Sequence, residues 1–512
     1  MNAKLRWQIY TLLIFIAAGL AFGRIIAVDN IADRAVQEYR LRTIPSQLAE
    51  KEKTLRSRGA SQAAIDRELA KTKAALQKTY QTERPFLSAN DRSRFCTIRV
   101  LVEPELRETR TVMKNGVAVE ETVPYAIDKI TTRRGWDTID MVYHTLPDAP
   151  EGTGYLYSSK PPLLPTVMAV PYWVIYKTTG KTFDTDLFFV TRLMLVICHL
   201  IPLVVGWFLT AAMIERFGKT DWGRLFAVAV TCFGTFLSTF VVTLNNHLPA
   251  VFCIIAAMYA GTRIWFDGDT RKRWFALSAF SATFAMACEL PTALFLAFLG
   301  LALLIKHPKP TMIAGVPACL LVLAGFFGTN FIAHQTPFPA YSQQSWYFYH
   351  YDKYGKDFDS YWMNRQGIDE GEPSRAAYAF HCTLGHHGIL SLTPVWWLSV
   401  IGLGGWLLQK NDRKFRGPAL MMIAMTLICF LFYMGMEQAN RNYGGMTSGL
   451  RWMFWLIPFW TLALLPAADS FSRTRFFRGI ALVLLFFSVM SVAYPLWNPW
   501  SHPWLHHLKY WL

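Results

Sequence analysis

Charged residues are scarce in this 512-residue chain, because Asp, Glu, Lys and Arg together make up only 17% of it. Soluble domains contain about a quarter of charged residues, so this shortage points to a membrane protein. Cysteine is also rare, and the eight that occur lie mostly in apolar stretches, which excludes a disulfide scaffold. The sequence has no Walker-type loop, GxGxxG fingerprint, HExxH pair or zinc-ribbon cysteine spacing. It therefore gives no sign of a nucleotide-fed site.

Aromatic residues are abundant, with 37 Phe, 21 Tyr and 19 Trp, and this much apolar surface excludes a disordered chain. The chain carries a net charge of +16. A basic excess of this kind is typical of proteins that bind nucleic acid or a membrane. The positions of the charges must separate these two classes.

Eleven apolar stretches are predicted to cross the membrane, because a bilayer core about 30 Å thick needs roughly 20 residues of helix. The first follows Lys4 and Arg6 and is interpreted as an uncleaved anchor. A further apolar segment, 163–176, is short and contains Pro165 and Pro171, so we expect an interfacial helix on the outer face. The predicted spans are 9–26, 187–214, 223–242, 247–265, 273–289, 291–305, 311–333, 389–409, 417–436, 452–468 and 477–497.

Basic residues cluster in five short loops between these spans. Lys and Arg in short loops stay on the cytoplasmic side, and eleven crossings from a cytoplasmic N-terminus place all five loops there. The basic excess is thus partly a topology signal, and nucleic acid is not an expected partner. The sequence predicts a multi-pass protein of the cytoplasmic (inner) membrane, in contact with membrane lipids.

The predicted fold is a polytopic α-helical membrane protein of about eleven transmembrane helices, with a mixed α/β extracytoplasmic domain in the first outer loop. That domain, at 29–186, is expected to contain a helical hairpin (46–80) and a β-hairpin (109–122), whose turn is Asn115-Gly116. The expected divisions are 1–28 for the first transmembrane helix, 29–186 for the outer domain, 187–333 for helices 2–7, 334–388 for an aromatic-rich outer loop, and 389–512 for helices 8–11 with a short outer tail.

Two basic residues are candidate phosphate ligands near the outer surface. Lys160 precedes Pro161 and Pro162, which hold it in an extended turn where the interfacial helix begins. The alternative is a lysine that only anchors the helix. The loop 442–451 contains Tyr443 and three glycines and ends at Arg451, whose planar fork suits phosphate oxygens. Its alternative is a flexible loop with an interfacial arginine.

Several acidic residues are candidates for a general base. Asp91 lies beside Arg92 and Arg94, which favour its ionised form, as a proton acceptor requires. For each outer aspartate, the alternative is an ordinary solvated residue. The other aspartates considered are Asp29, Asp128, Asp137 and Asp140.

Glu289 differs from these aspartates because it lies at a membrane boundary, where ionisable residues are usually functional or paired. His247 is a candidate metal ligand, but an ordinary interfacial histidine is the alternative, because no metal-binding spacing surrounds it. The aromatic residues of 334–388 suit both a sugar face and a membrane interface.

The overall pattern resembles the GT-C superfamily of membrane glycosyltransferases. The run Ser-Lys-Pro-Pro-Leu at 159–163 resembles the lysine-diproline motif of bacterial aminoarabinose transferases and their relatives of the protein O-mannosyltransferase type. The loop 443–451 followed by Pro458, and the segment 385–394, resemble further features of the family.

The resemblance implies inverting transfer of a sugar from a polyprenyl-phosphate donor to a lipid, glycan or protein acceptor outside the cytoplasm. It implies that Asp91 is the base and that Lys160, assisted by Arg451, binds the lipid phosphate. The family aspartate usually follows the first helix closely, so 30–85 would be an insertion and Asp29 stays a second candidate. No cofactor is certain. A divalent metal is left open. Relatives often carry another acidic residue in the next outer loop, and the lack of one in 244–247 counts against a metal site built there.

Two rival functions remain open. A transporter or flippase of lipid-linked saccharides would also need many spans and interfacial cations, but no internal repeat is apparent. A non-catalytic membrane scaffold would recruit partners through its outer hairpin.

Overall fold

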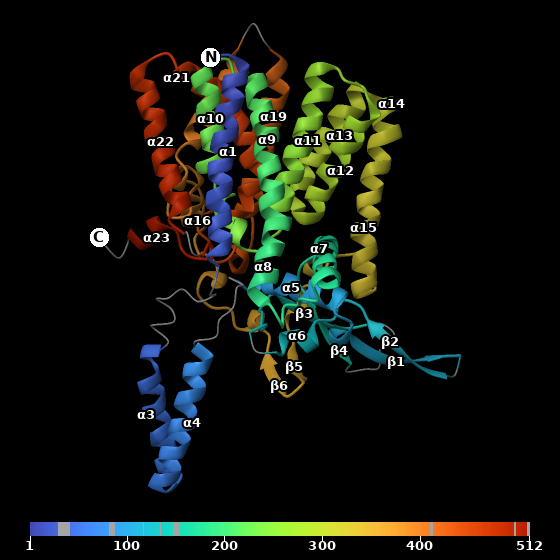
Figure 1. Cartoon of the computed structure of the whole chain (residues 1–512), viewed down its shortest axis with the longest axis vertical. Coiled ribbons are helices and arrows are strands. Elements are labelled where there is room, and N and C mark those ends of the chain that lie inside the picture. Colours follow the sequence, from blue (N-terminus) through green and yellow to red (C-terminus); the bar gives the residue numbers. More distant parts are fainter. Residues whose placement is uncertain are drawn as a thin grey trace.

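The chain forms a layer of long helices with a polar domain beneath it (Figure 1). The computed structural model describes residues 1–28, 41–80, 88–115, 117–133, 135–146, 153–409, 413–495 and 498–508. The helix layer contains α1 (Ala3–Ile26), α8 (Leu187–Leu195), α9 (Ile201–Phe217), α10 (Asp221–Phe233), α11 (His247–Asp267), α12 (Lys272–Cys288), α13 (Ala293–Lys306), α14 (Pro308–Pro310), α15 (Val316–His334), α18 (Trp396–Leu408), α19 (Arg416–Met434), α20 (Ile457–Ala463), α21 (Leu465–Phe471) and α22 (Arg475–Ala493).

The prediction of about eleven transmembrane helices is not supported. In the described residues, six helices are long and apolar enough to cross a membrane, or seven if one bent pair counts as a single span. The bent pair is Arg451–Ala463 with Leu465–Phe471, which meet at 41°. The six are Ala3–Ile26, Leu187–Phe217, His247–Asp267, Pro308–His334, Arg413–Met434 and Arg475–Ala493.

The other predicted spans fail because an apolar stretch does not ensure a continuous helix. The stretch 223–242 contains α10, which ends before Gly234, and then a 3₁₀ turn at Thr239–Val242. The stretches 273–289 and 291–305 form α12 and α13, of 17 and 14 residues, interrupted at Glu289. At 1.5 Å per residue, a helix of this length is shorter than a bilayer core of about 30 Å.

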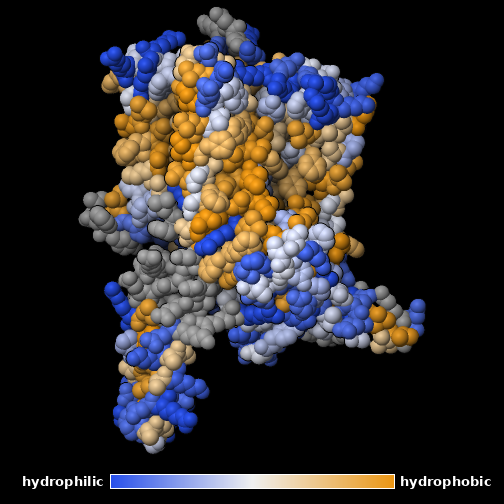
Figure 2. Space-filling view, in the orientation of Figure 1, coloured by the Kyte–Doolittle hydropathy of each residue, from blue (hydrophilic) through white to orange (hydrophobic). Residues whose placement is uncertain are grey.

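A continuous apolar band surrounds the helix layer on the face drawn in Figure 2. Its exposed side chains include Leu12, Phe15 and Leu20 of α1. The described basic loops gather at the end of this layer that is remote from the polar domain (Figure 1). Arg6 pairs with Glu215 and Asp221, and Arg216 pairs with Asp267, so contacts link these loops directly.

In the part of the chain that the structure describes, the polar domain contains short helices and three separate two-stranded antiparallel sheets. The predicted β-hairpin is present as β1 and β2, and the predicted helical hairpin as α3 and α4, with Gly59 at positive φ between them. The remaining described helices and strands are α3 (Ile44–Ser57), α4 (Gln62–Tyr80), α5 (Ala89–Val102), β1 (Glu108–Lys114), β2 (Val117–Val123), α6 (Asp128–Thr131), β3 (Met141–Thr145), β4 (Gly154–Ser158), α7 (Leu163–Thr179), β5 (His350–Lys353), β6 (Lys356–Asp359), α16 (Arg375–Thr383), α17 (Ile389–Leu392) and α23 (Trp504–Leu508).

Helix α7 starts directly after the two prolines that follow Lys160, since proline fits the first turn of a helix. It contains the segment predicted to be interfacial. Its exposed side chains include Val167, Val170 and Trp173, an apolar face of the kind that lies in a membrane interface.

A buried charge network holds α5 against α7. Arg99 pairs with Glu103 at 2.7 Å, and Glu103 also accepts a 2.7 Å hydrogen bond from the Tyr172 hydroxyl. Asp184 lies 2.6 Å from Arg99 and 2.9 Å from Arg133, so two carboxylates face two arginines. The Arg99 guanidinium lies 4.5 Å above the Trp136 ring. Losing one partner of such a network would leave a buried charge unpaired. This network fixes the helix whose other end forms the candidate site.

Candidate functional site

A cavity of about 210 Å³ lies where the helix layer meets the polar domain. It collects residues from the start of α5, the turn before α7, the start of α11, the break between α12 and α13, and the loop that ends at Arg451. Its lining residues are Asn90, Arg94, Lys160, Pro161, Leu164, Asn246, His247, Ala287, Cys288, Glu289, Leu290, Tyr341, Arg451 and Trp452.

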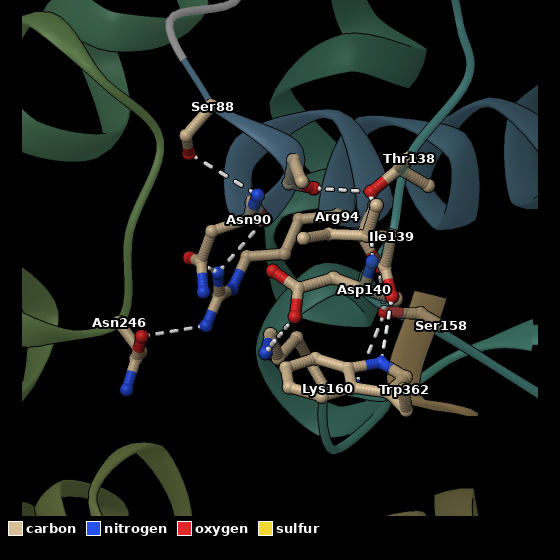
Figure 3. A network of polar contacts seen from close by, with 12 residues as sticks. Ser88, Asn90, Arg94, Thr138, Ile139, Asp140, Ser158, Lys160, Asn246 and Trp362 are labelled. Carbon is tan, nitrogen blue, oxygen red and sulfur yellow. Dashed lines mark hydrogen bonds and ion pairs between the residues drawn. The ribbon is translucent and has the colours of Figure 1, made fainter. Parts of the chain in front are cut away.

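Lys160 enters this cavity paired with Asp140. Its ammonium Nζ lies 2.8 Å from Asp140 Oδ1, and Figure 3 shows the two side chains meeting beside Arg94 and Trp362. The backbone supports this pair, because the Ser159 N–H donates to the Asp140 carbonyl at 3.1 Å. Trp362, from the aromatic-rich loop, donates its indole N–H to the Ile139 carbonyl at 2.9 Å.

The electrostatics of this pair follow from burial among cations. Burial raises the pKa of Asp140, but Lys160, Arg94 and Arg451 outweigh that effect and hold the pKa below its usual range. Burial lowers the pKa of Lys160; Asp140 opposes this effect, and Arg94 adds to it. Asp140 is therefore ionised at neutral pH, and its strength as a base depends on where Lys160 lies.

Arg94 is a second cation of the cavity, and its role was not predicted. It lies on α5 one turn after Asn90, whose carbonyl accepts from Arg94 Nη1 at 3.0 Å, while Nη2 donates to Asn246 Oδ1 at 2.5 Å. Burial lowers the pKa of Arg94 to about 10, so it stays cationic at neutral pH. Its orienting hydrogen bonds run to neutral amide oxygens, so its charge remains available to an anion. The only signal in the sequence was its spacing of one helical turn from Asn90.

Arg451 is the third cation, and the loop before it shapes its position. Its Nε donates to the Gly444 carbonyl at 2.9 Å, and its Nη2 donates to the same oxygen. The guanidinium lies 4.6 Å above the Trp500 ring. Its Nη1 is 2.9 Å from His247 Nε2, and His247 Nδ1 contacts Glu289 Oε1. Lys160, Arg451, His247 and Glu289, all candidates from the sequence, thus line one cavity.

Asp91 lies next to this cavity but serves α5 as a capping residue. Its Oδ1 accepts from the backbone N–H groups of Ser88 and Arg92, both at 2.9 Å, and its Oδ2 accepts from the Thr243 hydroxyl at 2.9 Å. Only 1% of the residue is exposed. The Ser88 hydroxyl reciprocates by accepting from the Asp91 N–H, which completes a capping box. The role of Asp91 as base stays a prediction.

The remaining candidates lie elsewhere or outside the described residues. Asp128 is fully buried between the Leu156 N–H at 2.8 Å and the Tyr351 hydroxyl at 3.0 Å, and burial raises its pKa to about 7. Asp137 is exposed and does not line the cavity. Tyr443 does not line it either, and its ring stacks on His387 with ring centroids 4.1 Å apart. Asp29 lies outside the described residues.

Within the described ranges, no three His, Cys, Asp or Glu side chains are arranged to hold a metal ion. The side chains gathered at this site are three cations (Arg94, Lys160 and Arg451), the carboxylates of Glu289 and of Asp140, which pairs with Lys160, and the imidazole of His247. Comparisons of the chain with protein-family models, with curated proteins and with solved structures find no match.

Proposed function

We propose that the chain is a GT-C-type glycosyltransferase of the cytoplasmic membrane, which moves a sugar from a polyprenyl-phosphate donor to an extracytoplasmic acceptor. One observation carries the proposal: Arg94, Lys160 and Arg451 line a single cavity at the border between apolar helices and a polar domain. A polyprenyl-phosphate donor fits this border, because its apolar tail suits the apolar helices and its anionic phosphate suits the three cations.

The three cations have a defined task in this reaction. When the bond between the anomeric carbon and the phosphate oxygen breaks, negative charge grows on that oxygen. Cations already held in place stabilise this charge more in the transition state than in the ground state. The phosphate then departs without a general acid.

The acceptor hydroxyl attacks the anomeric carbon from the face opposite the phosphate, so its configuration is inverted, as in inverting glycosidases. The hydroxyl proton passes to a carboxylate, and the lipid phosphate leaves with the bonding electrons. Asp140 suits this role, because donor phosphate that attracts Lys160 would release Asp140 from its ion pair and raise its basicity. The sequence motif favours Asp91 instead, so both carboxylates are tested below.

The place of the cavity also favours a one-sided enzyme over a transporter. Transporter sites lie near the bilayer midplane, so that each side gains access in turn. This cavity adjoins the polar domain, and the basic loops lie at the opposite end of the helix layer. By the positive-inside rule, the basic end is cytoplasmic and the cavity faces outward.

The test uses the purified chain in nanodiscs with a panel of polyprenyl-phosphate sugars and a panel of hydroxyl-bearing lipid, glycan and protein acceptors. It measures the acceptor-dependent release of polyprenyl phosphate. We expect Asp140→Asn to reduce turnover by at least a hundredfold, as loss of a general base does, with donor affinity kept within a few-fold. Asp137→Asn is the matched control, because Asp137 is exposed and lies in the same segment, and it should retain full turnover.

Asp91→Asn separates the two carboxylates. Asp91 is the N3 residue of the capping box, and a negative charge in the first turn of a helix contributes about 0.3–1 kcal/mol, so Asp91→Asn should melt slightly earlier and keep its turnover. Loss of turnover in Asp91→Asn with full activity in Asp140→Asn would return the role of base to Asp91. The flippase would be favoured if no donor released lipid phosphate and if the chain, reconstituted in vesicles, moved lipid-linked sugar across the bilayer.

A further inference from the structure

A buried chain of hydrogen bonds connects Glu289 to both arginines of the cavity. Glu289 Oε1 contacts His247 Nδ1 and accepts a 2.5 Å hydrogen bond from Asn246 Nδ2. His247 Nε2 lies 2.9 Å from Arg451 Nη1, and Asn246 Oδ1 lies 2.5 Å from Arg94 Nη2. Two consecutive residues at the start of α11 therefore each connect the same carboxylate oxygen to a different arginine.

The chemistry of these groups fixes the direction of each bond. A guanidinium only donates, so His247 Nε2 must be the unprotonated acceptor of the Arg451 N–H. The proton of the neutral ring is then on Nδ1 and is donated to Glu289. The Asn246 amide follows the same logic, because its NH₂ donates to Glu289 and its oxygen accepts from Arg94. The carboxylate thus sets the tautomer of His247 and the orientation of Asn246.

The backbone brings Glu289 to this point. It lies between α12 and α13 in an extended conformation, with φ −137° and ψ 99°, before the 3₁₀ turn Leu290–Thr292. Asn246 also donates to the Cys288 carbonyl at 3.0 Å, which joins the start of α11 to the end of α12. The break between the predicted spans 273–289 and 291–305 is therefore the element that delivers the carboxylate.

The geometry points to Glu289, through His247 and Asn246, as the positioning residue that holds Arg451 and Arg94 ready for the donor phosphate. This inference rests on the proposed function. The described contacts of Arg451 engage Nε, one N–H of Nη1 and one of Nη2, which leaves one N–H on each terminal nitrogen. Each of these two N–H groups can donate to a phosphate oxygen.

The positioning role differs from two other roles for Glu289. A catalytic base needs the negative carboxylate, whereas positioning needs only an oxygen that accepts two hydrogen bonds. A glutamine oxygen has two lone pairs and can accept from both His247 and Asn246. A merely structural role would lower the melting temperature of every variant without a specific effect on phosphate binding.

The experiment measures equilibrium binding of farnesyl phosphate to the full chain in nanodiscs. We expect Glu289→Ala to weaken binding at least tenfold, and Glu289→Gln to restore it to within threefold of the original affinity. His247→Ala should weaken binding about tenfold. Its effect should fall below twofold when Arg451 is already alanine, because His247 acts on the phosphate through its direct contact with Arg451. Its effect should stay larger than this when Arg94 is alanine, because His247 reaches Arg94 only indirectly, through Glu289 and Asn246.

The outcomes separate this inference from the function on which it rests. An equal effect of His247→Ala in both arginine backgrounds, or a Glu289→Gln variant as weak as Glu289→Ala, would overturn the positioning role while donor binding by the original chain stands. If the original chain binds no farnesyl phosphate, the proposed function fails, and this inference fails with it. Melting temperatures of all variants identify any loss that comes from unfolding alone.

Discussion

A substitution at Gly444 should displace the Arg451 side chain while residue 451 itself remains arginine. Gly444 has φ +99°, and a Cβ added there would lie 2.9 Å from Arg451 Nε and 3.1 Å from Arg451 Cβ. The next residue, Gly445, has φ +78°, but a Cβ added to it would meet no atom within 4 Å. Both N–H groups donate to Asn442 Oδ1 at 3.0 Å, so the two glycines belong to one turn. Gly445→Ala is therefore a matched control for Gly444→Ala.

The two substitutions share one cost and differ in another. An alanine at positive φ costs about 1–2 kcal/mol, and both variants should lose this much stability. Only Gly444→Ala also pushes Arg451 away from the Gly444 carbonyl and from His247. A hydrogen bond to a charged group contributes about 1.5–3 kcal/mol, and each 1.4 kcal/mol is a tenfold change in affinity. We therefore expect farnesyl phosphate to bind at least tenfold more weakly to Gly444→Ala than to the original chain, and Gly445→Ala to keep the original affinity.

The assay is equilibrium binding of radiolabelled farnesyl phosphate in nanodiscs, with thermal unfolding measured in parallel. Similar melting temperatures combined with weaker binding in Gly444→Ala alone would support a phosphate contact by Arg451. Equal affinity in the two variants would refute the reasoning, because the collision would then have no effect on the ligand.

Two further predictions concern stability. Burial raises the pKa of Asp128 to about 7, so the folded state favours the protonated carboxyl. The free energy of unfolding should therefore fall as the pH rises from about 4 to about 7, and then level off. At about 1.4 kcal/mol per pH unit, the loss reaches about 4 kcal/mol. Thermal unfolding across this range should show the decline, and Asp128→Asn should remove it; a decline that persists in Asp128→Asn would show that another group causes it. The second prediction concerns Gly402, where an added Cβ would lie 1.9 Å from the Ala463 carbonyl oxygen, so Gly402→Ala should lower the free energy of unfolding by about 3 kcal/mol or more. Gly404→Ala is the control. A Cβ at Gly404 meets no atom within 4 Å, so this variant should not destabilise the helix. Equal melting temperatures for these two variants would contradict the close packing of α18 on α20.

Local sequence patterns predicted the features that depend on neighbouring residues. The Asn115-Gly116 pair indicated the turn between β1 and β2, and the prolines after Lys160 indicated the start of α7. The apolar stretches indicated membrane helices, but their number was wrong. Whether such a stretch forms one helix depends on interruptions such as the one in 223–242, where α10 ends before Gly234 and a 3₁₀ turn follows at Thr239–Val242, and hydropathy does not report this interruption.

Asp91 shows a limit of motif reasoning. A serine followed three residues later by an acidic residue predicts a capping box, and Ser88 and Asp91 form one. The same aspartate also matches the motif position of a catalytic residue. A single sequence allows both interpretations, because capping and catalysis require the same carboxylate and differ only in what lies near it.

The sequence by itself determined that this chain has a membrane layer and a polar domain, because hydropathy is a property of each residue and of its immediate neighbours. It also indicated Lys160 and Arg451 as candidate site residues, from the prolines that follow Lys160 and from the glycine-containing loop that precedes Arg451. Only the tertiary structure brought Arg451 to His247, 204 positions away, and both into one cavity with Arg94 and Lys160. The physical reason is that contacts between distant segments depend on how helices end, bend and pack together, and no local pattern contains that information.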